Sequence, residues 1–132
     1  MIRGKEMLIQ YTVTPFKEIA KEKKIEYEKV ADYDYNGILE HFSHALVYKY
    51  KAKTDNDKYC VKAGDLVTVI ETGTGSCDGS YVICIIMIPG ELNKDEVFKI
   101  VKREERKYIN DSIHSFREYK KRLGYKENDI FD

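Results

Sequence analysis

The apolar run from Tyr81 to Ile88 (YVICIIMI) constrains the fold more than any other segment of the chain. A glycine-rich stretch, Thr72 to Ser80 (TGTGSCDGS), precedes this run, and Pro89-Gly90 ends it. The run is about half as long as the ~18 apolar residues that a membrane span needs. A short apolar segment between turn signals is typical of a central strand with both faces covered. We therefore expect a sheet built around this strand.

Further β-rich segments are separated from one another by clusters of turn residues. Thr54-Asp55-Asn56-Asp57 and Ala63-Gly64-Asp65 are polar turns of the kind that join hairpin strands. The succession of hairpins predicts an antiparallel sheet or a small β-barrel. The predicted strands are Leu8 to Val13, His44 to Lys53, Lys58 to Lys62 and Leu66 to Glu71, and the ambiguous segment Ile25 to Tyr35 has the alternation of an extended chain.

The last third of the chain is predicted to be helical. Asn93 and Glu96 have the spacing of a capping box at a helix start. The phase of the apolar pattern changes near Asn110-Asp111, which favours two helices over a single long one, and Gly124 suits the end of the second. Two apolar stripes follow from the spacing, one of Val97, Ile100, Val101 and Tyr108, and one of Ile109, Ile113, Phe116 and Leu123.

A short helix is also expected near the N-terminus, with Thr14 as N-cap and Pro15 as its first residue. The fold class is therefore α+β, with an antiparallel sheet or small barrel followed by two C-terminal helices. A length of 132 residues suits a single domain. Residues 1–90 are expected to be mainly β, residues 91–124 helical and residues 125–132 a tail.

The sequence predicts a cytoplasmic protein without a membrane span. The first ten residues lack the apolar run of a secretory signal. Cys60, Cys77 and Cys84 are odd in number and have no CxxC spacing, which favours free thiols in a reducing compartment.

No set of residues predicts catalysis, a metal or a cofactor. The glycine-rich stretch precedes a strand and lacks the GK[ST] of a phosphate-binding loop. His41 and His44 have a metal-compatible spacing only if helical, and Cys77 has no base beside it. Asp32 and Asp34 would share one face of a strand, but no His or Lys completes a catalytic pair. We therefore expect a protein that is not an enzyme.

The uneven distribution of charge is the main functional signal. Lys and Arg total 23, as do Asp and Glu, so the net charge is zero. Between Lys99 and Lys126, however, ten basic residues face four acidic ones, a net charge of +6. Such a segment is either a solvated helical surface or an anion-binding face. In the second case Arg103, Arg106, Arg117 and Arg122 would hold phosphates, and Tyr108 or Phe116 would stack a base.

The segment KYCVKAGDLVTV, from Lys58 to Val69, followed by the glycine-rich stretch and Tyr81-Val82-Ile83-Cys84, resembles the KxGDxVxV strand–turn–strand segment of short phage proteins with an SH3-like β-barrel. This resemblance covers about a quarter of the chain and implies a small barrel without catalytic residues. In layout alone, a small sheet with two C-terminal helices is similar to phage anti-Thoeris proteins. That family sequesters cyclic ADP-ribose-type immune signals, some members bind cyclic oligonucleotides, and its members oligomerise.

The function expected from the sequence is non-catalytic binding of a small anionic nucleotide-type immune signal, as an anti-defence protein that is phage-encoded and homo-oligomeric. One alternative is a protein-interaction module that inhibits or adapts a larger protein. Another is a small nucleic-acid-binding β-barrel, whose affinity would fall steeply with salt.

Overall fold

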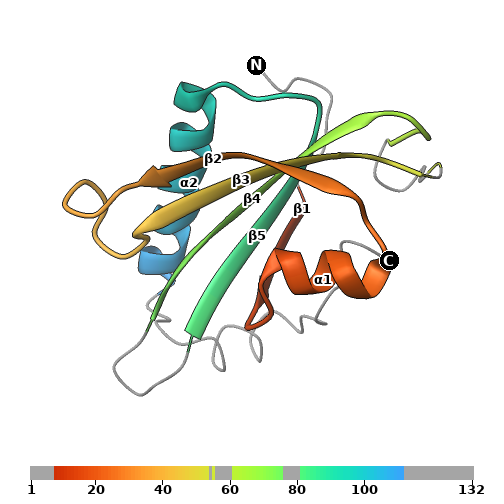
Figure 1. Cartoon of the computed structure of the whole chain (residues 1–132). Coiled ribbons are helices and arrows are strands. Elements are labelled where there is room, and N and C mark those ends of the chain that lie inside the picture. The colour runs from red at the N-terminus through yellow and green to blue at the C-terminus, as the bar shows by residue number, and fades with distance from the viewer. Residues whose placement is uncertain (1–7, 54, 56–60, 76–80, 112–132) are drawn as a thin grey trace.

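The computed structural model describes residues 8–53, 55, 61–75 and 81–111, which form one antiparallel sheet with a helix on each face (Figure 1). The prediction of an α+β fold with an antiparallel sheet is confirmed. In chain order the elements are β1 (Leu8–Thr12), α1 (Phe16–Lys23), β2 (Tyr27–Asp34), β3 (His44–Lys51), β4 (Leu66–Gly75), β5 (Tyr81–Pro89) and α2 (Lys94–Asn110).

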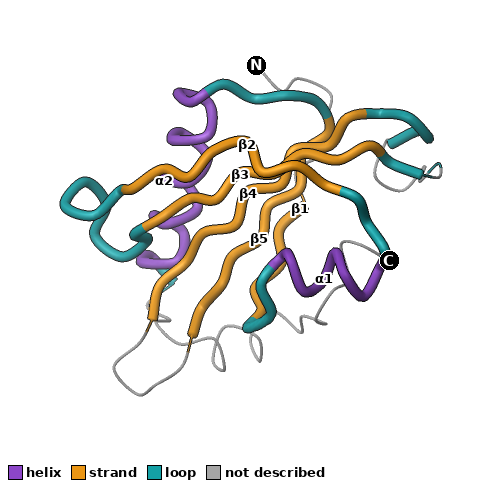
Figure 2. The backbone as a smooth tube through the Cα atoms, viewed as in Figure 1, coloured by secondary structure: helices purple, strands orange, loops and turns teal. Residues whose placement is uncertain are grey.

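The five strands lie in the order β1-β5-β4-β3-β2, with every neighbouring pair antiparallel. Strands β2 to β5 form a meander of successive neighbours, and β1 adds to its far side beside β5. The connection from β1 to β2 therefore crosses from one edge of the sheet to the other, and α1 lies within it (Figure 2). The described strands form an open sheet. Of the two predicted alternatives, an antiparallel sheet and a small barrel, the described residues therefore form the sheet.

Strand β5 is the predicted central strand and is buried on both sides. Cys84, Ile86 and Ile88 belong to the core cluster that contains the α2 residues. The alternating residues Ile85 and Met87 belong to the cluster that contains the α1 residues. A continuous apolar sequence is needed here because both sides of the strand are buried from Cys84 to Ile88.

Helix α2 begins as the sequence predicts. The Asn93 side chain accepts a hydrogen bond from the backbone N–H of Glu96 at 2.8 Å, and the Asn93 N–H donates to the Glu96 carboxylate at 3.0 Å. That second bond lowers the pKa of Glu96. The predicted stripe is buried, and the helix ends at Asn110 with Asp111 as C-cap. The second predicted C-terminal helix lies in residues 112–132, outside the described residues.

Helix α1 begins one residue later than predicted, because Pro15 rather than Thr14 is its N-cap. Pro15 has no side-chain donor or acceptor, and Glu71 of β4 supplies the missing acceptor. A Glu71 carboxylate oxygen accepts the Phe16 N–H at 2.8 Å. Burial raises the pKa of Glu71, while this hydrogen bond and the charge of Lys17 lower it. The Phe16 ring also lies against Tyr48 at 4.9 Å between centroids, so α1 is held to the sheet at its first residue.

Strand β4 is longer than the predicted strand, which ends at Glu71, and it continues through Thr72 to Gly75 into the glycine-rich stretch. The backbone geometry at Gly73 explains why a glycine is needed within this strand. Its φ is +149°, and a Cβ atom at this position would collide with the carbonyl oxygen of Val82 on β5. Gly73 therefore allows β4 and β5 to approach each other closely.

Strand β2 forms one edge of the sheet and carries a bulge. Its register with β3 shifts between Lys29 and Ala31, and the extra residue, Val30, is 51% exposed. Bulges and charged residues are common on edge strands because they hinder pairing with another sheet.

Among the described helices, none combines the length and apolar character required to cross a membrane.

Substitution of Gly73 with alanine should lower the free energy of unfolding by at least about 3 kcal/mol, because backbone strain and a clash with Val82 add together. Gly37→Ala is the matched control. Gly37 also has positive φ, at +81°, but a Cβ there meets open space, so only the strain of about 1–3 kcal/mol applies. Urea unfolding of both variants measures the difference. Equal losses would show that the approach of β4 and β5 is not the cause.

Candidate anion-binding face

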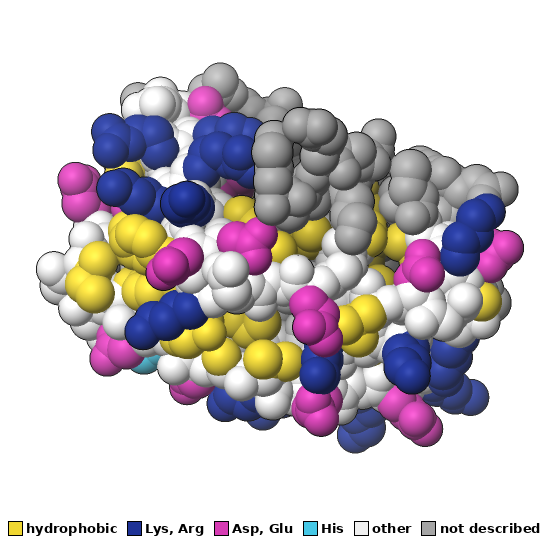
Figure 3. Space-filling view, turned by 90° about the horizontal axis from the view of Figure 1, so that it is seen from above, with side chains coloured by type: hydrophobic (Ala, Val, Ile, Leu, Met, Phe, Trp, Pro, Cys, Tyr) yellow, Lys and Arg dark blue, Asp and Glu magenta, His cyan; other side chains and the backbone are white. Residues whose placement is uncertain are grey.

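The outer side of α2 is a cationic surface, which we call the basic face. Figure 3 shows lysine and arginine side chains gathered at the corner of the molecule where α2 lies. Between Lys99 and Lys107 the structure describes every residue and leaves no carboxylate exposed, because Glu104 and Glu105 are buried. The exposed cations of the basic face are Lys94, Lys99, Lys102, Arg103, Arg106 and Lys107.

Glu104 and Glu105 are turned into the core at 2% and 5% exposure. Glu104 accepts a hydrogen bond from the Tyr11 hydroxyl of β1 at 2.8 Å. Glu105 accepts two, from the backbone N–H groups of His41 and Phe42, each at 2.7 Å. These bonds tie α2 to β1 and to the loop between β2 and β3. Buried carboxylates need such partners because burial removes their hydration.

Cys84 lies beside this polar cluster, and its environment does not favour a nucleophilic thiol. It is fully buried, and burial raises its pKa well above the usual value. The charge of Glu104 acts in the same direction, and a hydrogen bond with Tyr11 opposes it. A thiol held protonated and away from solvent is a poor nucleophile.

The six predicted ligand-binding residues have different outcomes. Arg103 and Arg106 lie on the basic face, as expected. Tyr108 is 1% exposed, with its ring 5.7 Å from that of Phe42 and 6.1 Å from that of His41. The stacking role that we predicted for Tyr108 is therefore wrong, because core side chains cover its ring. The remaining three, Phe116, Arg117 and Arg122, lie outside the described residues.

Two other aromatic rings border the basic face, and we call Tyr33 and Phe98 the aromatic ledge. Both are half-buried, and Figure 3 shows hydrophobic side chains directly beside the cations of α2. The Lys94 ammonium lies 5.7 Å from the Tyr33 ring centroid, and the Lys102 ammonium lies 5.9 Å from that of Phe98. The ledge therefore places two rings within reach of two amines.

Tyr35 supports the ledge from beneath. Its ring lies 5.3 Å from that of Phe98 and 6.3 Å from that of Tyr33. Burial raises the pKa of Tyr35, and Tyr33 adds to the increase.

Sequence reasoning missed the ledge because β2 is far from α2 along the chain. The available signal was the alternation of Tyr33 and Tyr35 on one face of an extended segment.

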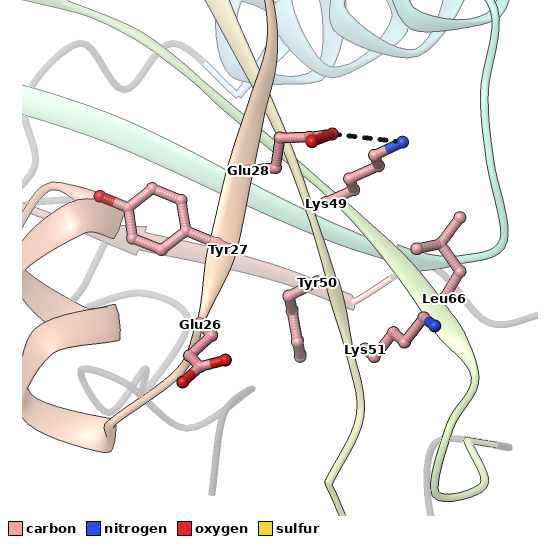
Figure 4. A pocket seen from close by; sticks show the side chains of 7 residues that line it. All are labelled: Glu26, Tyr27, Glu28, Lys49, Tyr50, Lys51 and Leu66. Carbon is pink, nitrogen blue, oxygen red and sulfur yellow. Dashed lines mark ion pairs between the residues drawn. The ribbon is translucent and has the colours of Figure 1, made fainter.

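A surface hollow at the other end of β2 and β3 is less suited to an anion (Figure 4). Its charged lining consists of two acids and two lysines, and Lys49 pairs with Glu28 at 3.3 Å. Burial raises the pKa of Tyr50 in its wall to about 12. The complete lining is Glu26, Tyr27, Glu28, Lys49, Tyr50, Lys51 and Leu66.

The two histidines and the two aspartates with suggestive spacing, which are His41, His44, Asp32 and Asp34, do not form a metal centre. Asp32 and Asp34 do share one face of β2, and His44 Nδ1 lies 3.8 Å from Asp32 Oδ1. Within the described ranges, however, no three His, Cys, Asp or Glu side chains are grouped so that they could hold an ion. The basic face with its aromatic ledge is therefore the strongest candidate for a functional site.

Removal of the Glu105 carboxylate should destabilise the protein, because two backbone N–H groups lose their acceptor. We expect Glu105→Ala to lower the free energy of unfolding by about 2–4 kcal/mol. Glu105→Gln should cost less because the amide oxygen still accepts a hydrogen bond. The exposed neighbour Arg106→Ala should stay within about 0.5 kcal/mol of the parent. Hydrogen exchange at the His41 and Phe42 amides should accelerate in Glu105→Ala alone, and unchanged exchange there would contradict this role.

Comparison of the chain with protein-family models, with curated protein sequences and with solved structures gives no match in any of the three. The resemblances to phage SH3-like and anti-Thoeris proteins therefore stay predictions.

Proposed function

We propose that this protein is a non-catalytic binding protein that holds a phosphate-bearing, nucleotide-type anion on the basic face of α2. One observation carries the proposal: five exposed cations lie between Lys99 and Lys107 without an exposed carboxylate among them. The resemblance in layout to anti-Thoeris proteins, predicted from the sequence, suggests sequestration of an immune signal as the biological role. Sequestration requires affinity and no chemistry at the ligand.

The spacing of these cations suits recognition of phosphate. Lys99, Lys102 and Arg106 follow one another at intervals of three and four residues, which places their side chains along one side of a helix. Arginine adds a planar group that can donate two parallel hydrogen bonds to a phosphate. Several cations side by side also create a field that attracts anions from a distance, even on a chain of zero net charge.

Helix stability alone does not account for this distribution. A helix dipole favours cations only in the last turn, where α2 has Lys107. Lys94, Lys99 and Lys102 lie too early in the helix to gain from that effect. Ion pairing with acids one turn away is another common reason for surface lysines. It applies to Lys99, which follows Asp95 and Glu96 by one turn and adds to the capping hydrogen bond in lowering the pKa of Glu96. It does not account for Lys102, because the acid one turn away, Glu105, faces the core.

A second candidate function is a protein-interaction module that uses the edge formed by β2. Val30 on the bulge and Ile38 in the following loop are 51% and 64% exposed. This function predicts no affinity for phosphate compounds, which separates it from the first.

Removal of two adjacent cations tests the proposal. We expect Lys102→Ala/Arg106→Ala to weaken binding of an anionic nucleotide by at least about tenfold, because each charged hydrogen bond contributes about 1.5–3 kcal/mol. The ligand panel is ADP, ADP-ribose, its cyclic isomers and cyclic dinucleotides, measured by thermal shift and then by calorimetry. Lys17→Ala/Lys21→Ala is the matched control, since it removes two exposed cations at the same spacing from α1. Equal affinities in the two double variants would refute the assignment.

A further inference from the structure

We propose that the ligand of the basic face is a single-stranded nucleic acid, whose phosphates follow the cations of α2 and whose bases stack on Tyr33 and Phe98. This inference rests on the proposed function and deepens it by naming the class of ligand. It also assigns base stacking to Tyr33 and Phe98, whose rings are partly exposed to solvent, in place of the buried Tyr108.

The first argument is the shape and length of the cationic surface. From Lys94 to Lys107 its cations span about 20 Å along the helix, at 1.5 Å per residue, and Asp95 and Glu96 are the acids between Lys94 and Lys99. At about 3.4 Å per nucleotide of a stacked strand, that length matches about six nucleotides. A single nucleotide would reach only a fraction of these cations. Small ligands are also usually held in concave pockets, whereas the outer side of a helix is convex.

The second argument is the pairing of each ledge ring with an amine. Lys94 lies beside Tyr33 and Lys102 beside Phe98, at 5.7 Å and 5.9 Å from the ring centroids. These distances are close to the limit of about 6 Å for cation–π attraction, so the amines are held only weakly. Each amine can therefore turn to a phosphate when a base occupies the ring. Cations interleaved with aromatic rings are the general solution for binding single strands.

The third argument is the rigidity of the ledge. Tyr33 is anchored in β2 by its pairing with Ala45, and Phe98 rests on Tyr35 at the boundary of the core. The Glu105 bonds hold the loop after β2 on the same helix that carries Phe98. Because both rings are already fixed in place, little conformational entropy is lost when a base stacks on them. In a duplex the base faces are already covered, so the ledge favours single strands.

The test uses fluorescein-labelled oligothymidylates of two, four, six and ten nucleotides, a ten-base-pair duplex, and thymidine monophosphate as competitor. Anisotropy titrations of the full chain should show affinity that rises with length up to about six nucleotides. For the ten-nucleotide strand, log K should fall linearly with log salt, by about 0.7 for each phosphate neutralised. Lys102→Ala should reduce that slope by about 0.7.

Tyr33→Leu and Phe98→Leu test the ledge while keeping apolar volume. Each should weaken binding of the ten-nucleotide strand by at least about fivefold, because stacking on an aromatic ring contributes that much or more for each base. Tyr27→Leu is the matched control, since Tyr27 lies on the same strand but on the other face, against Phe16. It should leave affinity unchanged. Melting temperatures identify any variant that is merely unfolded, and Phe98→Tyr should then restore binding.

Each other outcome overturns the inference in a distinguishable way. If thymidine monophosphate binds as tightly as six nucleotides, the ligand is small, and the proposed function survives alone. If length matters but both leucine variants bind normally, or the duplex binds more tightly than the strand, charge alone acts and the ledge has no role. If neither these oligonucleotides nor the nucleotide panel binds, the proposed function fails together with the inference.

Discussion

The burial of two neighbouring carboxylates under α2 determines the arrangement on which the rest of the structure depends. Glu104 reaches β1 through the Tyr11 hydroxyl, and Glu105 accepts the N–H groups of His41 and Phe42 in the loop after β2. A helix held only by apolar side chains can rotate or slide at modest cost. Three directional hydrogen bonds, which reach β1 and the loop after β2, restrict both movements. The rotation of α2 about its axis is thereby set.

This rotation decides what the protein presents to solvent. When both acids face the core, the opposite side of α2 retains only cations between Lys99 and Lys107. The same rotation places Phe98 against Tyr35, whose ring also lies near that of Tyr33 on β2. One set of buried bonds therefore produces both a concentrated positive charge and an adjacent aromatic surface. A chain of zero net charge can in this way carry a strongly cationic site.

Local signals in the sequence predicted the elements well where a short segment contains all the information. The capping box of Asn93 and Glu96 and the apolar run of β5 are of this kind. The predictions failed where a distant residue takes part. Thr14 was chosen as the cap of α1, yet Glu71 of β4 supplies the acceptor for Phe16. Tyr108 was assigned to a ligand, yet Phe42 and His41 cover it.

The sequence by itself determined that β1, β3 and β5 are strands, that α1 and α2 are helices, and which side of α2 is apolar, because hydrophobic periodicity and capping act over a few residues. It left β2 ambiguous and placed the end of β4 too early. Only the tertiary structure decided that β1 joins the sheet beside β5, that the connection containing α1 crosses to the opposite edge, and that Tyr35 meets Phe98. Contacts of this kind depend on how the segments bury one another's apolar surface and satisfy buried polar groups. The charge of the basic face also depends on tertiary structure, because the packing of α2 buries Glu104 and Glu105 away from solvent.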